Sequence, residues 1–298
     1  MTDRRRRSQE NSLLTETRRL LRRFGLQARK GLGQHFLVDK AVLNRIVSEA
    51  DLAPTDVVIE VGPGLGVLTG ELSRRAGRVI AVELDNKLAA ILNQVMASFK
   101  NVTIINEDVL KVEPAALLAE IDFKELSKSY KVVANLPYYI TSPVLRHFLE
   151  SERKPDVMIV MVQKEVAEDI VGRPGRRSLL SISVQLYGQP EIVDYVPAGC
   201  FYPAPEVDSA VLKVTPYPQP AVDIDDTEGF FTLVRAGFSA ARKQIGNSLA
   251  QGLGVSKDEA LVLLSVAGIS PQRRAETLTL EEWAQLWRVF QGAGGPKC

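Results

Sequence analysis

Five short apolar runs alternate with helix-length segments through the first half of the chain. The runs are residues 56–62, 78–84, 101–108, 130–137 and 156–163. Strands that are buried on both faces have continuous apolar sequences, and parallel strands need a long crossover, usually a helix, between them. The alternation therefore predicts a doubly wound, Rossmann-like α/β fold with a parallel sheet covered by helices on both faces.

Two later segments also have strand character. Residues 178–197 and 209–217 are expected to add strands, the second of them antiparallel at the edge of the sheet. A proline-rich stretch from residue 216 to 220 and the acidic residues after it then predict a linker.

Everything beyond this linker has a helical pattern. Ser256 with Glu259, and Thr279 with Glu282, fit the capping box that begins a helix. We therefore expect a basic extension over residues 1–26, a Rossmann-like domain over 27–217 and a small all-α domain over 218–298.

The first thirty residues are strongly basic, although the whole chain is nearly neutral. The chain has 37 Lys and Arg against 36 Asp and Glu, so only the distribution of charge can indicate a polyanionic partner. Between residues 12 and 24, apolar side chains recur among arginines at roughly helical spacing, which predicts a short basic amphipathic helix. A solvated tail and a nucleic-acid-binding arm are both compatible with this composition.

Several classes of protein are disfavoured by composition. Cys200 and Cys298 are the only cysteines and His35 and His147 the only histidines, so neither a disulfide framework nor a histidine-rich metal site is expected. No apolar run approaches the length of a membrane span, and the N-terminus lacks an apolar signal core. The sequence favours a soluble cytoplasmic protein without a metal or a membrane partner.

A glycine-rich turn follows the first apolar run. The segment VIEVGPGLGVL places Gly62, Gly64 and Gly66 between a strand and a helix, where backbone without Cβ atoms can approach a ligand closely. The dinucleotide fingerprint requires glycine where Val67 stands, so the turn is a poorer match to a pyrophosphate site.

Polar residues also end the next three runs. Glu83 is placed to accept hydrogen bonds from ribose hydroxyls, Asp108 from an exocyclic adenine amine, and Asn135 ends the fourth run. Each residue alone is also compatible with a helix N-cap. Together they predict a site for an adenosine-bearing cofactor that lacks a pyrophosphate, S-adenosyl-L-methionine.

Six motifs then occur in a specific order: GLGQHFL, EVGPGLGVLT, VIAVELD, NEDVL, NLPYYITSP and FYPAPEVDSAV. In this order and spacing the chain resembles the bacterial rRNA adenine N6,N6-dimethyltransferases over about residues 27–290. The resemblance implies a class I methyltransferase that dimethylates two adjacent adenines near the 3′ end of 16S rRNA. It further implies a monomer that acts on immature 30S subunits during ribosome biogenesis.

The resemblance also assigns roles to individual residues. The implied cofactor contacts are His35, Leu37, Gly62, Glu83, Asp108 and Asn135, and the glycine turn itself adds Gly64. The expected catalytic set is Asn135, Leu136, Pro137, Tyr138 and Phe201.

The NLPY residues suit methylation of an adenine amine, which is a weak nucleophile because its lone pair is delocalised into the ring. The side-chain oxygen of Asn135 and the carbonyl oxygen of Leu136 can each accept an N6 hydrogen and align the amine with the methyl donor. Pro137 favours an extended Leu136, and Tyr138 offers a face for base stacking.

Two further aromatic residues lie in or next to these motifs. Phe201, in the rigid FYPAPEV segment, is expected to form a second stacking face, although its context also suits a core residue. Tyr139 receives no role and is expected to pack.

A base in folded RNA must be extruded before it can enter such a pocket, and basic side chains should hold the surrounding phosphates. The candidates are the N-terminal arginines, Arg29, Lys30, Arg173, Arg176, Arg177, Arg235, Arg242 and Lys243, the last three placed on the first helix of the second domain. Three alternative functions remain open: a resistance-type 23S rRNA adenine methyltransferase, a factor that mainly binds immature 30S subunits, and a small-molecule dehydrogenase.

Overall fold

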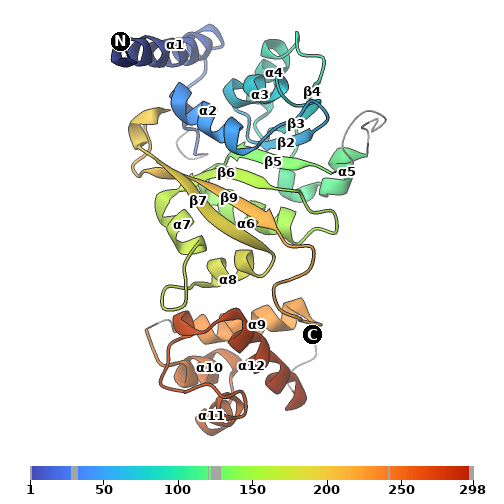
Figure 1. The fold of residues 1–298 in the computed structure, drawn as a ribbon, viewed down its shortest axis with the longest axis vertical. Coiled ribbons are helices and arrows are strands. Elements are labelled where there is room, and N and C mark those ends of the chain that lie inside the picture. The colour runs from blue at the N-terminus through green and yellow to red at the C-terminus, as the bar shows by residue number, and fades with distance from the viewer. Residues whose placement is uncertain (1, 28–32, 120, 122–128, 241, 295–298) are drawn as a thin grey trace. The chain divides into compact units, whose positions relative to one another are not determined.

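The structure is a computed structural model that describes residues 2–27, 33–119, 121, 129–240 and 242–294, with side chains from residue 13 onward. The chain forms two compact units (Figure 1). The first contains Met1–Ala167 and Pro190–Pro216, and the second contains Glu168–Gln189 and Tyr217–Cys298.

The strands are β1 (Phe36–Leu37), β2 (Val57–Val61), β3 (Arg78–Val82), β4 (Val102–Ile105), β5 (Lys131–Asn135), β6 (Met158–Gln163), β7 (Gly188–Val196), β8 (Phe201–Tyr202) and β9 (Ser209–Pro216). The helices before residue 171 are α1 (Thr2–Arg23), α2 (Lys40–Glu49), α3 (Val67–Ser73), α4 (Asn86–Val95), α5 (Pro114–Leu118), α6 (Thr141–Leu149) and α7 (Lys164–Ile170). Short 3-10 helices are η2 (Val109–Lys111), η3 (Tyr138–Ile140) and η4 (Ala198–Cys200).

The main sheet has seven strands in the order β4-β3-β2-β5-β6-β9-β7. The ladders from β4 to β6 are parallel, and β9 runs antiparallel to β6. All five predicted apolar runs are strands of this sheet, which confirms the predicted doubly wound fold. The last strand is also antiparallel as predicted, but β7 rather than β9 occupies the edge.

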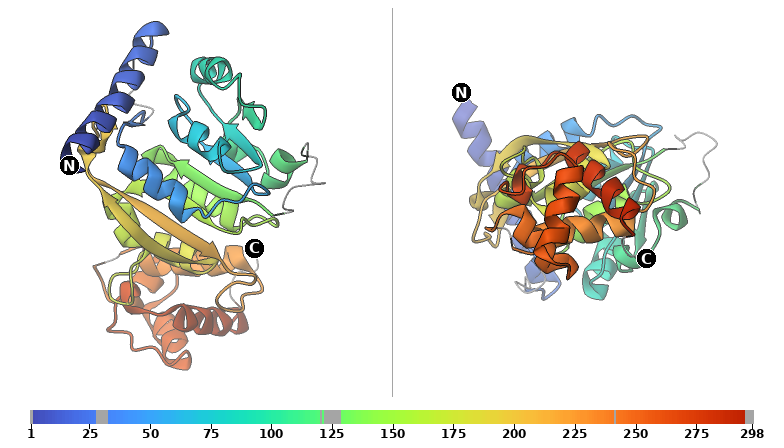
Figure 2. Two further views of the ribbon diagram at one scale, coloured as in Figure 1. Left: turned by 45° about the horizontal axis from the view of Figure 1, so that its top comes forward. Right: turned by 90° about the horizontal axis from the view of Figure 1, so that it is seen from below.

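The helices α2, α3 and α4 share one face of the sheet (Figures 1 and 2). Leu43 and Ile46 of α2 and Leu72 of α3 pack with Val79 of β3 in the main core, while Leu92 of α4 packs on Ala81 of the same strand. Alternate residues of a strand point to the same face, so these three helices cover one layer.

Local signals fix where these helices begin. The Asp39 side chain accepts from the backbone amides of Ala41 and Val42 at 2.8 and 2.9 Å and caps α2. Asp85 caps α4 in the same way, which places the N-cap two residues after Glu83 and the first helical residue at Asn86. An N-cap of this kind stabilises a helix by about 0.5–2 kcal/mol relative to alanine.

The second unit contains α8 (Leu179–Gln185), α9 (Thr227–Phe238), α10 (Ile245–Leu253), α11 (Lys257–Val266), η5 (Ala275–Thr277) and α12 (Leu280–Gly292). The capping boxes predicted at Ser256 and Thr279 are both formed. The predicted strand over 178–197 is wrong in its first half, where α8 forms. The apolar residues of this segment fit the repeat of a helix as well as that of a strand. A capping box between Ser178 and Ser181 starts the helix.

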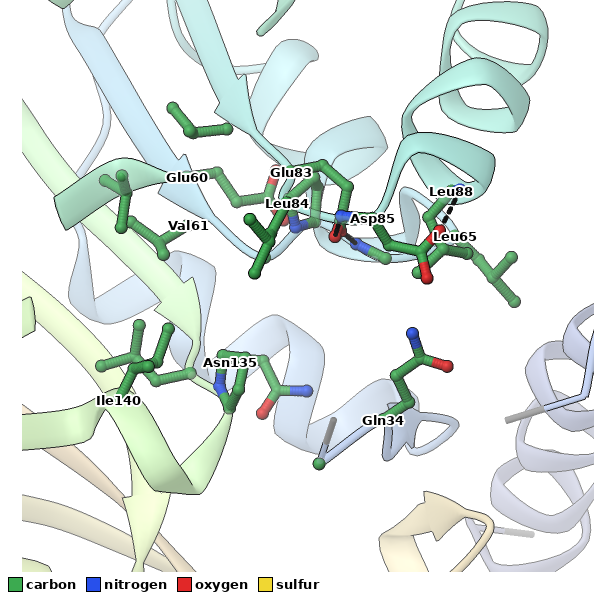
Figure 3. Close-up of a pocket in the computed structure, with 18 of the residues that line it drawn as sticks. Gln34, Glu60, Val61, Leu65, Glu83, Leu84, Asp85, Leu88, Asn135 and Ile140 are labelled. Atoms are coloured by element: carbon green, nitrogen blue, oxygen red, sulfur yellow. Dashed lines mark hydrogen bonds between the residues drawn. The ribbon is translucent and has the colours of Figure 1, made fainter. Parts of the chain in front are cut away.

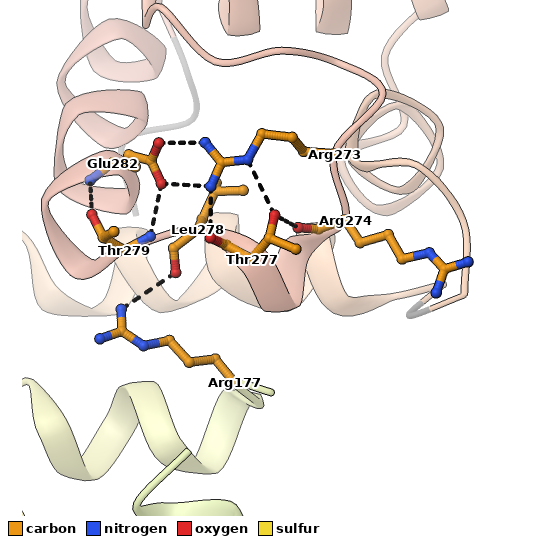
Figure 4. A network of polar contacts seen from close by, with 7 residues as sticks. All are labelled: Arg177, Arg273, Arg274, Thr277, Leu278, Thr279 and Glu282. Atoms are coloured by element: carbon orange, nitrogen blue, oxygen red, sulfur yellow. Dashed lines mark hydrogen bonds and ion pairs between the residues drawn. The ribbon is translucent and has the colours of Figure 1, made fainter. Parts of the chain in front are cut away.

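A polar network holds the loop before α12 (Figure 4). The Arg273 guanidinium binds both carboxylate oxygens of Glu282 and the Thr277 carbonyl oxygen, and Glu282 also accepts from the backbone amide of Thr279. One arginine therefore ties the loop to the capped start of α12.

The boundary between the two units falls after Pro216, and residues 168–189 pack with the C-terminal helices. The sequence predicts residues 27–217 in one domain and 218–298 in the other.

Within the described part of the chain, no helix is both long and apolar enough to cross a membrane.

Candidate active site

A cavity of about 560 Å³ opens at the carboxyl ends of the parallel strands of the first unit. Gly62 directly follows β2, Glu83 directly follows β3, Asp108 lies three residues after β4, and Asn135 is the last residue of β5. Because β4, β3, β2 and β5 are neighbours in the sheet, the four residues lie side by side along one edge. All four line the cavity, as predicted from their positions at the strand ends.

The glycine turn has a backbone that other residues adopt only with strain. Gly62 and Gly64 have φ values of +66° and +58°. A Cβ atom on Gly62 would lie 3.3 Å from the Pro137 ring, and one on Gly64 would lie 3.2 Å from the Phe36 ring. The turn is therefore in close contact with the NLPY segment and with β1, and it has no room for side chains.

Glu83 is held by two backbone amides. Its carboxylate accepts from Gly64 N at 3.2 Å and from Asp85 N at 2.9 Å, so it joins the glycine turn to the start of α4. Burial raises the pKa of Glu83, and the two amides oppose that rise. In Figure 3 the side chains of Glu83 and Asp85 lie across the pocket from Gln34 and Asn135.

Glu60, which sequence reasoning did not assign to the site, also lines the cavity. It is only 1 % exposed, and burial raises its pKa to about 8, with the Glu83 charge adding to the rise. Neither Glu60 Oε2 nor Thr69 Oγ1 makes a hydrogen bond to a described residue. Buried polar atoms are rarely left unpaired, so these oxygens mark a position where a ligand group or ordered water can bind.

Asp108 forms the N-cap that its sequence position allowed, and its contact with the cofactor adenine stays a prediction. One carboxylate oxygen accepts from the Leu110 amide at 3.1 Å and caps η2. The same residue lines the cavity, so its cap keeps the carboxylate fixed at the pocket wall.

The Asn135 amide is oriented by a contact with a distant loop. Its Nδ2 donates to the His35 carbonyl oxygen at 3.1 Å. This bond fixes the orientation of the amide and does not use the acceptor Oδ1. The His35 ring stacks on Tyr138 with centroids 5.9 Å apart, and its Nδ1 is 2.8 Å from the Pro203 carbonyl oxygen. His35 therefore connects Asn135, Tyr138 and the FYPAPEV segment.

The rest of the NLPY segment is fixed by short-range contacts. Leu136 is buried and its amide donates to the Met161 carbonyl oxygen at 3.1 Å. Pro137 begins the single turn of η3, and the Tyr138 hydroxyl is 2.7 Å from Ser209 Oγ. Burial raises the pKa of Tyr138, so its phenol stays protonated at neutral pH.

Tyr139 does not pack, and the expectation that it would is wrong. The side chain is 54 % exposed and lines the cavity, and its pKa is raised by partial burial and by the charges of Glu83 and Asp108. In a 3-10 turn successive side chains point about 120° apart. Because Tyr138 points toward Ser209, the Tyr139 side chain must point in a different direction.

Leu37 and Phe201 are paired in the two-stranded ladder of β1 and β8. Leu37 lines the cavity and its side chain lies in the main core, while its contact with the cofactor stays a prediction. Phe201 is 4 % exposed, belongs to the same core cluster and is not among the residues that line the cavity. A second stacking face at Phe201 stays a prediction, because the ring would have to leave this core position.

The basic side chains that were predicted to contact RNA differ in availability. Arg29 and Lys30 lie outside the described residues, as do the side chains of Arg4 to Arg7. Arg173 and Arg176 are exposed in the loop before α8. Arg177 is partly buried and donates to the Leu278 carbonyl oxygen at 3.3 Å, so it holds its own unit together (Figure 4).

The three other candidates lie around the α9 to α10 turn of the second unit. Arg235 is on α9 and donates to Thr232 Oγ1 at 2.9 Å. Arg242 and Lys243 are exposed in the turn after α9 rather than on a helix, which corrects the predicted continuous helix. Within the described residues, no group of three or more His, Cys, Asp and Glu is arranged to hold a metal ion.

Comparison with known proteins identifies the family of this chain. The family of ribosomal RNA adenine dimethylases matches residues 25–291. The ribosomal RNA small subunit methyltransferase A of Dehalococcoides mccartyi (strain 195) is 55% identical over 94% of each chain, and that of Moorella thermoacetica is 46% identical over 91% of this chain and 96% of the other.

Two solved structures share the fold. The 23S rRNA methyltransferase ErmE has a TM-score of 0.64 and 28% identity, with 86% of this chain and 99% of the other covered. A dimethyladenosine transferase from Plasmodium falciparum has a TM-score of 0.71 and 23% identity, with 87% of this chain and 98% of the other covered. With the family match over nearly the whole length, this chain belongs to the ribosomal RNA adenine dimethylase family.

Proposed function

We propose that this protein dimethylates N6 of two adjacent adenines near the 3′ end of 16S rRNA with S-adenosyl-L-methionine. We further propose that it acts as a monomer on immature 30S subunits in the cytoplasm. The observation that carries the proposal is the row of Asp108, Glu83, Gly62 and Asn135 along one sheet edge, with Tyr138 beside it.

The pocket fits the cofactor by the chemistry of its walls. Glu83 and Asp108 are acceptors for ribose hydroxyls and an adenine amine, and Gly64 lets the backbone come close to the ligand. The unpaired oxygen of Glu60 supplies a further buried polar atom that a ligand group can hydrogen-bond. When bound, the cofactor would supply the electrophilic sulfonium methyl group.

The substrate side of the pocket is built from neutral groups. Asn135 Nδ2 is held by His35, so Asn135 Oδ1 can accept one N6 hydrogen of the target adenine. The Leu136 carbonyl oxygen is proposed to accept the second hydrogen. These contacts would hold the amine at a near-attack distance of about 3–3.5 Å from the methyl group. Neither Asn135 nor a protonated Tyr138 is a strong base, so the proton would pass to water.

Tyr138 is proposed to stack on the flipped adenine. One face of its ring is against His35, and the hydroxyl is held by Ser209, so the ring is fixed before a base arrives. Base stacking on an aromatic ring contributes about 1–3 kcal/mol. Phe201 would add a second face if base binding drew its ring from the core.

The choice of 16S over 23S rRNA is supported by the relatives. Proteins named ribosomal RNA small subunit methyltransferase A reach 55% identity, against 28% for the 23S rRNA methyltransferase ErmE. Purified protein should be incubated with methyl-labelled cofactor and either 30S or 50S subunits from cells that lack the corresponding methylation. Label in the 30S RNA alone is expected, and label confined to 50S RNA would overturn the proposal.

A further inference from the structure

The helix α1 has two different faces along residues 13–24. Thr17, Leu20 and Leu21 are buried, whereas the four arginines of this stretch are exposed: Arg18, Arg19, Arg22 and Arg23. Their spacing of one and four residues places them on one side of the helix. Glu16 is the only acidic residue between residues 13 and 27.

The buried face of α1 packs on the wall of the cofactor pocket. Leu20 and Leu21 form a cluster with Phe36, Leu65 and Leu88, and the last three also line the cavity. Full burial of a leucine side chain contributes about 1.5–3 kcal/mol, so this contact can hold the helix in place. The exposed arginines are therefore presented at a fixed position next to the site.

One arginine also contacts the segment that supports the predicted base-binding ring. The Arg18 guanidinium lies over the Tyr202 ring, 4.8 Å from its centroid. The next residue, Pro203, contacts His35, and His35 stacks on Tyr138. A chain of direct contacts thus connects α1 with Tyr138.

No carboxylate among the described residues neutralises the charge of this surface. None of the four arginines forms an ion pair with a carboxylate of a described residue. Guanidinium groups bind phosphate oxygens in a bidentate manner, which suits RNA. A basic amphipathic helix can also bind an anionic membrane, but it does so through its apolar face, and that face is already buried here.

We propose that α1 is an RNA arm that grips phosphates next to the target adenine through Arg18, Arg19, Arg22 and Arg23. The inference rests on the proposed function, because it assumes an RNA substrate. The helix ends at Arg23, two residues before the match to the family model begins.

The test compares three variants with the wild type. In the first, all four arginines are changed to glutamine, and in the second they are changed to lysine. The control changes four exposed arginines that already face carboxylates to glutamine: Arg45, Arg74, Arg75 and Arg146. The first variant and the control lose the same charge, and circular dichroism and thermal melting check that each variant folds.

Binding to a 16S rRNA 3′ fragment and to 30S subunits is measured between about 0.05 and 0.2 M salt, without cofactor, so that methyl transfer is not needed for the readout. The glutamine variant should bind RNA at least about tenfold more weakly, and the slope of log affinity against log salt should fall by about three. The lysine variant keeps the four charges, so it should recover the salt slope but only part of the affinity, because lysine cannot bind a phosphate in a bidentate manner. Cofactor affinity should stay within about twofold of the wild type in both variants.

Three results for the glutamine variant would overturn the proposal that α1 binds RNA. The first is RNA affinity equal to that of the control, and the second is a loss of cofactor affinity as large as the loss of RNA affinity. The third is loss of binding to anionic phospholipid vesicles with RNA affinity unchanged. A wild-type protein that binds RNA through these arginines but methylates no adenine would support the arm while contradicting the proposed function.

Discussion

The side-chain amide of Asn135 donates to the backbone carbonyl of His35 across 3.1 Å, although the two residues are 100 positions apart in the sequence. The bond joins the end of β5 to the segment just before β1. It determines which end of the Asn135 amide is an acceptor, and the His35 ring in turn stacks on Tyr138. The substrate side of the pocket is thus preorganised by one histidine.

Changing Asn135 to alanine should slow methyl transfer by about 100-fold or more, because the target amine loses the group that positions it. Cofactor affinity should fall much less, since Glu83, Asp108 and the glycine turn remain. Single-turnover methylation and calorimetric cofactor binding measure the two effects separately. Full methyl transfer by the Asn135→Ala protein would show that the assignment is wrong.

Tyr138 allows its ring and its hydroxyl to be tested separately. Tyr138→Phe loses only the bond to Ser209, so its rate should fall by less than about tenfold, as expected for one hydrogen bond. Tyr138→Ala also loses stacking of about 1–3 kcal/mol, which corresponds to roughly 5- to 150-fold. Steady-state kinetics on 30S subunits should rank wild type, phenylalanine and alanine in that order, and equal rates for the two variants would exclude stacking.

Much of the site could be predicted from the sequence because parallel strands end at one edge. Gly62, Glu83 and Asn135 each stand at the end of an apolar run, so their neighbourhood follows once the sheet is parallel. The bond between His35 and Asn135 could not be predicted in this way, since it depends on how the β1 segment folds back over the sheet edge.

Other features depend on local geometry that residue patterns do not specify. Residues 179–185 have apolar positions that suit a strand, but the Ser178 cap makes them a helix. The exposure of Tyr139 follows from the turn of η3, and the core position of Phe201 follows from the pairing of β1 with β8. The sequence does indicate Glu60, as an acidic residue two positions before the first glycine of the turn. Its burial is visible only in the structure.

Glu83 is expected to act in cofactor binding more than in the chemical step. Changing Glu83 to alanine removes acceptors for two hydroxyl groups, and hydrogen bonds to a charged group contribute about 1.5–3 kcal/mol each. Cofactor affinity should therefore fall at least about tenfold in calorimetry, with a smaller change in kcat at saturating cofactor. Glu71→Ala, a partly buried glutamate outside the cavity, is the control, and unchanged cofactor affinity in the Glu83 variant would contradict its assignment.

Glu60 should make stability depend on pH. Burial raises its pKa from 4.5 to about 8, so between these values the folded chain keeps a proton that the unfolded chain has lost. The free energy of unfolding therefore falls as the pH rises through this window. Glu60→Gln stays neutral and should gain stability relative to the wild type on going from about pH 5 to about pH 8. Urea unfolding at both pH values measures the difference, and a gain of the same size at each would contradict the raised pKa.

Mass analysis of rRNA is the most direct test of the proposed reaction. Subunits from cells that lack the 16S modification are incubated with the protein and cofactor, and the RNA is then digested and its fragments are weighed. We predict two methyl groups on N6 of each of two adjacent adenines in the 3′-terminal fragment of 16S rRNA, and a much smaller methylated fraction after the same time with the Asn135→Ala protein. Unmodified 16S rRNA, or methyl groups found only in 23S rRNA, would contradict the proposed function.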